Sequence, residues 1–217
     1  MILAHVLTIK LQSIMKSPSL LMVLGAAFLL GLFVFPLWTI SLEAPQYPNG
    51  IGMHIYLDGL QGKEKHDLQN IDGLNHYIGM RKLPKSHEMW EFSVFPKVIG
   101  AMAILGISIG LFGFFKNISP RWFLGWLILM CILGILGMYD FNNWMVDYGT
   151  NLDPKAIMKM TDAEGRPLSY KPPLFGTRHI LNFVAHSYPS GGAYMMGFGM
   201  VLTFIAYFLG MKKLKTK

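Results

Sequence analysis

Cysteine and charge are both scarce in this chain. Cys131 is the single cysteine among 217 residues, and only 14% of the residues are charged. One thiol cannot form a disulfide within the chain, nor can it supply the paired thiols of a zinc site or of covalently attached haem. With 53% hydrophobic residues and so little charge, the chain has the composition of a membrane protein.

Familiar catalytic motifs are missing as well. The sequence contains no phosphate-binding loop, no dinucleotide-binding glycine fingerprint, no HExxH and no Ser/His/Asp or Cys/His constellation. We therefore expect no enzymatic activity. The centres of the apolar segments also lack histidine and charged residues, which argues against a haem held between two helices, a pump or a proton-coupled carrier. We expect no haem.

Four apolar segments are long enough to cross a hydrocarbon core about 30 Å thick, which requires roughly 20 residues of helix. The first is too long for a signal-peptide core and is followed by no small-residue cleavage pattern, so we expect it to remain as an anchor. The sequence predicts an all-α membrane protein: a four-helix transmembrane bundle with a small mixed extracytoplasmic cap formed by two long loops. The predicted parts are an amphipathic cytoplasmic N-terminus (1–16), spans at 17–40, 94–115, 122–139 and 191–211, outer loops at 41–93 and 140–190, a cytoplasmic turn (116–121) and a cytoplasmic tail (212–217).

The charges predict the orientation. Residues 1–16, 116–121 and 212–217 carry eight Lys or Arg and no acid, whereas the two long loops and their edges hold all twelve acids and the other eleven bases. By the positive-inside rule, both termini and the short turn face the cytoplasm and both loops face outward from a bacterial inner membrane. Because topology explains the net charge of +7, we expect the lipid bilayer and no nucleic acid as a partner.

Short patterns predict local structure in the first loop. The proline-rich entry at 43–50 is not expected to form regular helix or central strand. Alternation at 53–57 predicts a short strand, and apolar spacing at 66–78 predicts a helix with Gly79 as its C-cap. Gly106 and Gly110, like Ala193 and Gly197, are spaced for close helix packing.

In the second loop, aromatic residues at 139–149 suggest a continuation of the third helix, and Asn151 to Pro154 suggests the start of a short helix. A hairpin turn is expected at 163–166. Because both loops are rich in proline, glycine and aromatic residues, we expect them to pack on each other rather than to be disordered. The aromatic side chains suit either an interfacial belt or a docking surface for a partner, with Phe141, Trp144 and Tyr148 as the docking candidates.

Histidine and methionine are concentrated in the two loops. Asp72, His76 and Met80 are spaced four apart, so a helix would direct them to one side. Imidazole and thioether ligands together suit copper, and thioethers favour Cu(I). The alternative is that the methionines fill the core and the histidines are polar surface groups. The candidate copper ligands are His76, Met80, Met53, His54 and His66.

Both loops resemble a family of small polytopic membrane proteins associated with clade II nitrous oxide reductase gene clusters. The resemblance covers most of the chain, including the order of the helices. It is carried by EAPQYP (43–48), GM (52–53), HDL (66–68), LNHYIGM (74–80), YGxNLDP (148–154), PPLxG (172–176) and LNF (181–183).

The resemblance implies an inner-membrane accessory protein for the maturation of a periplasmic nitrous oxide reductase, or for copper or electron supply to it. The implied partners are that reductase or its maturation proteins, and the position of the resemblance agrees with the proposed copper ligands. Two alternatives stay open: a metal-free docking scaffold for a periplasmic partner, and a quinol-linked redox subunit.

Overall fold

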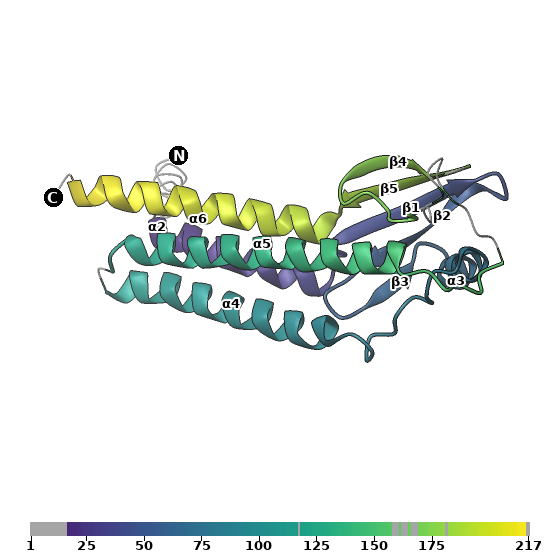
Figure 1. The fold of residues 1–217 in the computed structure, drawn as a ribbon. Coiled ribbons are helices and arrows are strands. Elements are labelled where there is room, and N and C mark those ends of the chain that lie inside the picture. The colour runs from purple at the N-terminus through teal and green to yellow at the C-terminus, as the bar shows by residue number, and fades with distance from the viewer. Residues whose placement is uncertain are drawn as a thin grey trace. The chain divides into compact units, whose positions relative to one another are not determined.

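The computed structural model describes residues 17–116, 118–157, 161, 165, 169–180 and 182–215. This part contains five α-helices, one 3-10 helix and a five-stranded antiparallel sheet (Figure 1). The chain divides into two compact units. The helical unit comprises Met1–Val34, Pro96–Gly134 and Tyr194–Lys217, and the sheet unit comprises Phe35–Phe95 and Ile135–Ala193. The predicted all-α class is therefore wrong, because the two segments expected as loops build a sheet.

The first apolar segment is shorter as a helix than predicted. Helix α2 (Pro18–Ala27) continues into the 3-10 helix η1 (Phe28–Phe33), and strand β1 begins at Trp38. Ser17 is at the N-cap and Pro18 at the first helical position, as expected, although the Ser17 hydroxyl makes no capping bond. Pro36 disfavours helix at the residue before it. The helical part is therefore shorter than the roughly 20 residues that a membrane crossing requires. The spanning helix expected at 17–40, the first of the four predicted, does not form.

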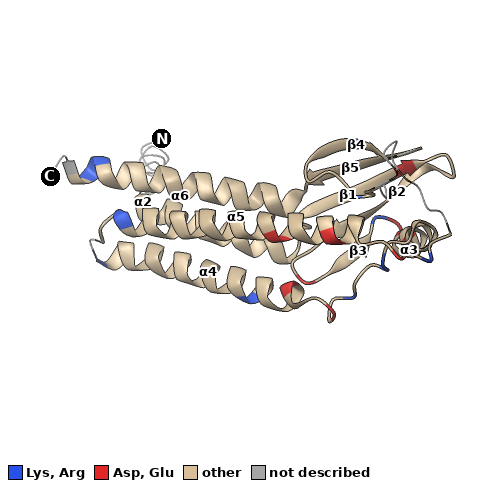
Figure 2. Cartoon of the chain, viewed as in Figure 1, with Lys and Arg blue, Asp and Glu red and all other residues tan. Residues whose placement is uncertain are grey.

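Among the described residues, three helices are long and apolar enough to cross a membrane: α4 (Trp90–Phe115), α5 (Arg121–Thr150) and α6 (Gly191–Lys215). They carry no Lys, Arg, Asp or Glu at 98–115, 122–139 or 192–211, and Figure 2 shows these stretches without coloured residues. Many of their large apolar side chains are exposed, as lipid-facing side chains are. By length and composition, the chain is membrane-associated.

Small residues allow close packing inside the helical unit. A Cβ atom on Gly106 or Gly110 of α4 would lie 2.6 Å from a side-chain atom of α2, so the predicted packing role of these two glycines is confirmed. The prediction for Gly197 is wrong, because a Cβ there would meet nothing within 4 Å. Gly199 has that role instead, since its Cβ would lie 2.4 Å from the carbonyl oxygen of Gly25. Helices α4 and α6 thus both approach α2 through glycine.

The sheet unit joins segments that lie far apart in the sequence. Its strands are β1 (Trp38–Ala44), β2 (Tyr47–Ile55), β3 (Leu60–Gly62), β4 (Gly176–Ile180) and β5 (Phe183–Pro189), in the spatial order β3-β2-β1-β5-β4. Strand β1 pairs with β5 from Trp38↔Pro189 to Glu43↔Val184. The expected packing of the two long segments on each other therefore takes the form of one continuous sheet.

The proline-rich entry lies within this sheet, contrary to expectation. Strand β2 runs through Pro48 although proline donates no hydrogen bond. The β1–β2 register shifts between Leu42 and Ala44, and β3 pairs only with residues 53–55 of β2. Pro48 thus lies where the ladder is irregular and where β3 does not reach, and Gly50, two residues further on, has φ +70°. These positions tolerate proline in a strand.

Helix α3 (Asp67–Ile78) matches its prediction closely. Gly79 ends it in the left-handed conformation at φ +81°, as a C-cap glycine does. At the other end, the buried Asp67 carboxylate accepts the backbone N–H groups of Gly52 at 2.9 Å and Glu64 at 3.1 Å. Asp67 therefore fastens the start of α3 to β2.

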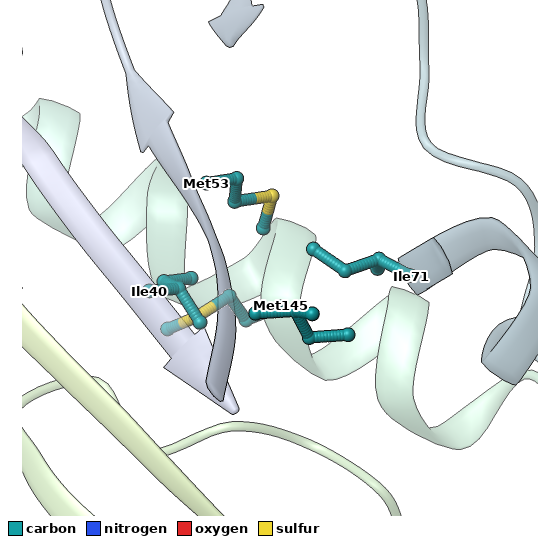
Figure 3. Close-up of a cluster of buried hydrophobic side chains, with 5 residues drawn as sticks. Ile40, Met53, Ile71 and Met145 are labelled. Atoms are coloured by element: carbon teal, nitrogen blue, oxygen red, sulfur yellow. The ribbon is translucent and has the colours of Figure 1, made fainter. Parts of the chain in front are cut away.

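One hydrophobic core holds the sheet unit together. In Figure 3 the side chains from β1, β2, α3 and α5 converge, and methionine sulfur lies among isoleucine side chains. The buried residues of this core are Ile40, Ile51, Met53, Ile71 and Met145. Helix α5 reaches it because the helix continues through the aromatic segment to Thr150, as predicted.

After α5 the chain turns rather than starting a helix. The backbone oxygen of Asp153 accepts the N–H of Ala156 at 3.0 Å, and its carboxylate accepts the N–H of Lys155 at 2.8 Å. The described part of the expected short helix is therefore a turn stabilised by Asp153. The predicted N-terminal segment 1–16 lies outside the described residues, and so does the predicted hairpin at 163–166 except for Gly165.

Candidate ligand-binding cavity

The sheet has one apolar and one polar face, because successive side chains of a strand point to opposite sides. Ile40, Met53 and Ala185 on the apolar face are buried. On the other face, the Thr39 hydroxyl lies 2.8 Å from His54 Nδ1, and the Thr177 hydroxyl lies 2.8 Å from His186 Nδ1. The apolar face can therefore wall a site for apolar ligands, whereas the polar face makes hydrogen bonds of its own.

A cavity of about 260 Å³ lies in the sheet unit. Its walls come from β1 and β2, from α3 and the segment after it, from the C-terminal turns of α5, and from residues 170–183. Most of the lining side chains are apolar. A mostly apolar cavity with a few polar groups is the usual form of a small-molecule site.

Aromatic rings and thioethers dominate part of the lining. The rings of Trp144 and Tyr148 stack with centroids 4.7 Å apart and planes inclined by 14°. The thioethers of Met53, Met80 and Met145 line the same cavity. Thioethers are polarizable and make favourable contacts with aromatic rings. This part of the lining therefore offers polarizable sulfur atoms and planar aromatic surfaces to a ligand.

A short chain of hydrogen bonds holds one side of the cavity. The buried Asn75 side chain donates to the Tyr148 hydroxyl at 2.8 Å, and that hydroxyl donates to the backbone oxygen of Arg81. The Arg81 guanidinium pairs in turn with Asp147. These bonds connect α3, the segment after it and the end of α5, so the polar groups fix the position of the Tyr148 ring.

Tyr170 contributes a polar group of a different kind. The residue is 5% exposed and lines the cavity. Its hydroxyl is buried and has no hydrogen-bond partner among the residues that the structure describes. Burial raises the pKa of this hydroxyl, so the group stays protonated and able to donate. An unsatisfied buried hydroxyl is unfavourable, and a ligand that accepts its hydrogen bond relieves that cost.

The structure separates the five candidate copper ligands. Met53 and Met80 both line the cavity. His54 follows Met53 in β2 and so points to the opposite face of the sheet, where it bonds to Thr39. Its pKa is lowered, first by burial and then by the nearby Lys63.

The other two candidate histidines lie away from the cavity. His66 and His76 are exposed, and His66 Nδ1 lies 3.3 Å from Gln69. Asp72 does not join His76 and Met80, because its carboxylate accepts the Leu83 N–H at 2.6 Å. Across the described part of the chain, no three or more His, Cys, Asp or Glu side chains are grouped so that they could hold a metal ion. Of the five candidate copper ligands, only Met53 and Met80 therefore line the same cavity.

The three docking candidates are partly or fully buried in the sheet unit. Phe141 packs against Trp38 with ring centroids 5.7 Å apart, and Trp144 is packed against the core. Tyr148 is 6% exposed. Sequence reasoning missed Met145 and Tyr170 as lining residues. Met145 falls between Phe141 and Tyr148 at helical spacing, which could have indicated the same helix face, whereas no local signal marks Tyr170.

In the part of the chain that the structure describes, helices occur together with an antiparallel sheet, and three of the helices are able, by length and composition, to cross a membrane. Comparison with models of protein families finds no match, and comparison with curated proteins finds none either.

Proposed function

We propose that this protein is an accessory protein of a nitrous-oxide-reducing system, held in a bacterial inner membrane with its sheet unit on the periplasmic side. One observation supports it above the others: the segments that resemble the nitrous-oxide-associated family all belong to the sheet unit. More than half of the residues that line the cavity fall within those segments. The resemblance and the cavity thus coincide in one folded unit.

The charge distribution supports the orientation. Lys212 and Lys213 near the end of α6, and Arg121 at the start of α5, mark the ends expected in the cytoplasm (Figure 2). The described acidic residues all lie in the sheet unit. Lys and Arg are enriched at the cytoplasmic ends of membrane helices, and the residues at the other ends of α4, α5 and α6 belong to the sheet unit, so we propose that this unit lies in the periplasm.

A strain that lacks this gene tests the proposal and separates its two forms. We expect the strain to reduce nitrous oxide more slowly than its parent. The reductase is then isolated from both strains and assayed with reduced methyl viologen. Normal activity with this artificial donor indicates a role in electron supply, whereas an inactive, copper-poor reductase indicates a role in maturation. Whole-cell reduction at the parental rate would sink the proposal.

Complementation tests whether the cavity is needed. The cavity-filling variant Leu74→Trp should fail to restore nitrous oxide reduction, because the larger side chain occupies the ligand space. Gln69→Ala, on the exposed side of the same helix, should restore it fully. Membrane levels of both variants are measured by immunoblot, so that loss of function is distinguished from loss of protein.

Copper supply is the second candidate, and one observation favours it. Met53, Met80 and Met145 bring three thioethers to the same cavity, and thioethers are suitable ligands for Cu(I). Titration of the purified protein with Cu(I), in competition with a chromogenic chelator, should show binding that the triple Met→Leu variant loses. His76→Ala is the matched control, since that histidine is exposed. Equal binding by the triple variant would contradict the assignment of copper to this cavity.

A further inference from the structure

The size of the cavity limits what it can hold. A volume of about 260 Å³ lies just below the range of about 300 to 1,000 Å³ that is usual for small-molecule pockets, which is room for a single ring system rather than a drug-sized molecule. Empty apolar space forfeits the van der Waals contacts of its lining. A ligand that fills this volume recovers them.

The lining favours a planar ring over a flexible chain. The stacked pair of Trp144 and Tyr148 presents aromatic surface, and Phe183 adds a further ring. Three thioethers, from Met53, Met80 and Met145, complete a surface suited to aromatic contacts. An alkyl chain would gain only contact area from these groups, whereas a conjugated ring also gains stacking and sulfur–ring interactions.

The polar groups favour a ligand with a hydrogen-bond acceptor. Tyr148 is already engaged as both acceptor and donor, so it has little left to offer. The Tyr170 hydroxyl is a buried donor without a partner among the described residues. Tyr170 also belongs to the cavity lining. Its oxygen has almost no accessible surface in this structure, so a rotation of the side chain is needed to present the hydroxyl to a carbonyl oxygen of the ligand.

We propose that the cavity binds a planar ring compound that bears a carbonyl group, with the chemistry of a quinone headgroup, and that Tyr170 donates a hydrogen bond to that carbonyl. The inference concerns the cavity alone and stands whether or not the protein serves a nitrous oxide reductase. Binding involves no covalent or redox step. The thioethers and the Trp144–Tyr148 pair contact the ring, and Tyr170 sets its orientation.

Calorimetric titration of the full-length protein in nanodiscs with menadione tests the proposal, with protein-free nanodiscs as the blank. We expect saturable binding with one site per chain. Tyr170→Phe should bind about 5- to 10-fold more weakly, the effect of losing one hydrogen bond of about 1 kcal/mol or slightly more. Tyr188→Phe is the matched control, because this tyrosine is exposed and its affinity for menadione should equal that of the parent.

A ligand without the carbonyl completes a thermodynamic cycle, in which two ligands are each compared on the parent and on Tyr170→Phe. 2-Methylnaphthalene should bind to the parent and to Tyr170→Phe equally, because it offers Tyr170 no acceptor. Leu74→Trp should abolish binding of both ring compounds while its thermal unfolding stays cooperative. Since Tyr170→Phe deletes a single hydroxyl that has no partner among the described residues, the variant is expected to fold, and its melting curve verifies this.

Three results would overturn the inference. The first is absence of saturable menadione binding to the parent protein. The second is equal menadione affinity in the parent and in Tyr170→Phe, which would exclude the proposed hydrogen bond. The third is saturable binding of oleate or of Cu(I) that Leu74→Trp abolishes, in a protein that does not bind menadione, which would assign the cavity to a lipid chain or to a metal.

Discussion

Asn75 is the residue on which one wall of the cavity depends. It is 5% exposed, and a buried amide is favourable only when its hydrogen bonds are made. Its bond to the Tyr148 hydroxyl positions that hydroxyl to donate to the backbone of Arg81. One amide therefore connects α3 to α5 and, through α5, to the segment that follows α3.

Replacing Asn75 by alanine should destabilise the protein by about 1 to 3 kcal/mol, because the buried Tyr148 oxygen loses its donor. For a chain of this size that corresponds to a fall of roughly 2 to 12 °C in the apparent Tm. Circular dichroism of the protein in detergent measures the shift. Gln69→Ala on the exposed side of the same helix is the control and should change Tm little. An unchanged Tm for Asn75→Ala would contradict the structural role of this bond.

Neighbouring residues show what sequence could and could not reveal about the site. Met53 and His54 are adjacent in a predicted strand, and the alternation of a strand already implies that they point to opposite faces. That signal could have excluded a site containing both. The meeting of Met53 with Met80 and Met145 depends on the packing of β2, α3 and α5, and no spacing along the chain encodes it.

At the scale of elements, α3 has two glycines in opposite situations. Gly79 ends the helix at φ +81°, and a Cβ there would lie 2.7 Å from the Cβ of Ala156. Gly73 lies inside the helix, and a Cβ there would meet nothing within 4 Å. The first glycine is required by backbone and space, whereas the second is not.

Opposite effects of the same substitution should follow. Gly79→Ala should lower stability by at least about 1 to 2 kcal/mol, the cost of a left-handed residue with a Cβ, and the contact with Ala156 adds to it. Gly73→Ala should raise stability by about 0.5 to 1 kcal/mol, because alanine loses less backbone entropy in a helix. Thermal unfolding of the two variants side by side measures both. Shifts of the same sign would contradict the position of the helix end.

Elements with local signals were predictable, and those set by distant pairing were not. Helix α3 and its C-cap follow from spacing and punctuation within thirteen residues, 67–79. The first residues of strand β1 were assigned to a membrane-spanning helix, because they lie at the end of an apolar run that is long enough to cross a membrane. Pro36 and the alternation of Trp38, Ile40 and Leu42 with polar residues were the signals against that interpretation. Strand β1 pairs with β5, and no pattern near β1 in the sequence indicates this pairing.

For the whole molecule, the most important pairing is that of β1 with β5, because it joins the two long segments in one sheet. Ser187 of β5 is fully buried, accepts the Trp38 indole N–H at 2.8 Å and donates to the Leu174 carbonyl oxygen at 3.2 Å. The sheet unit thus depends on residues from both long segments. A covalent connection between the two strands would test this arrangement directly.

Cysteines at Ser41 and His186, in a Cys131→Ser background, should form a disulfide, because the two residues are Cα partners across β1 and β5. Opposite residues in an antiparallel pair have Cα atoms about 4.5 to 5.5 Å apart, within the range of a disulfide. Oxidation of the purified protein followed by a non-reducing gel shows the link. Ser41→Cys with Ala185→Cys is the control and should not link, because Ala185 points to the other face.

The same variant reports the side of the membrane. A disulfide that forms in cells without added oxidant indicates an oxidising compartment, as we expect for a periplasmic sheet unit. Thiols that stay reduced in cells but link after purification would place the unit in the cytoplasm and contradict the proposed orientation. Failure to link even in the oxidised, purified protein would contradict the β1–β5 register.

The separation of these strands also has a consequence during synthesis. Strand β1 ends at Ala44 and β5 begins at Phe183, so the ribosome must add about 140 residues between them, which takes roughly 7 to 28 seconds at about 5 to 20 residues per second. During that interval one edge of β1 has no neighbour, and an open strand edge invites pairing with other chains. The nascent protein is therefore open to mispairing for this time, so protection by a chaperone or by rapid membrane insertion would be useful, and slower translation would lengthen the exposure.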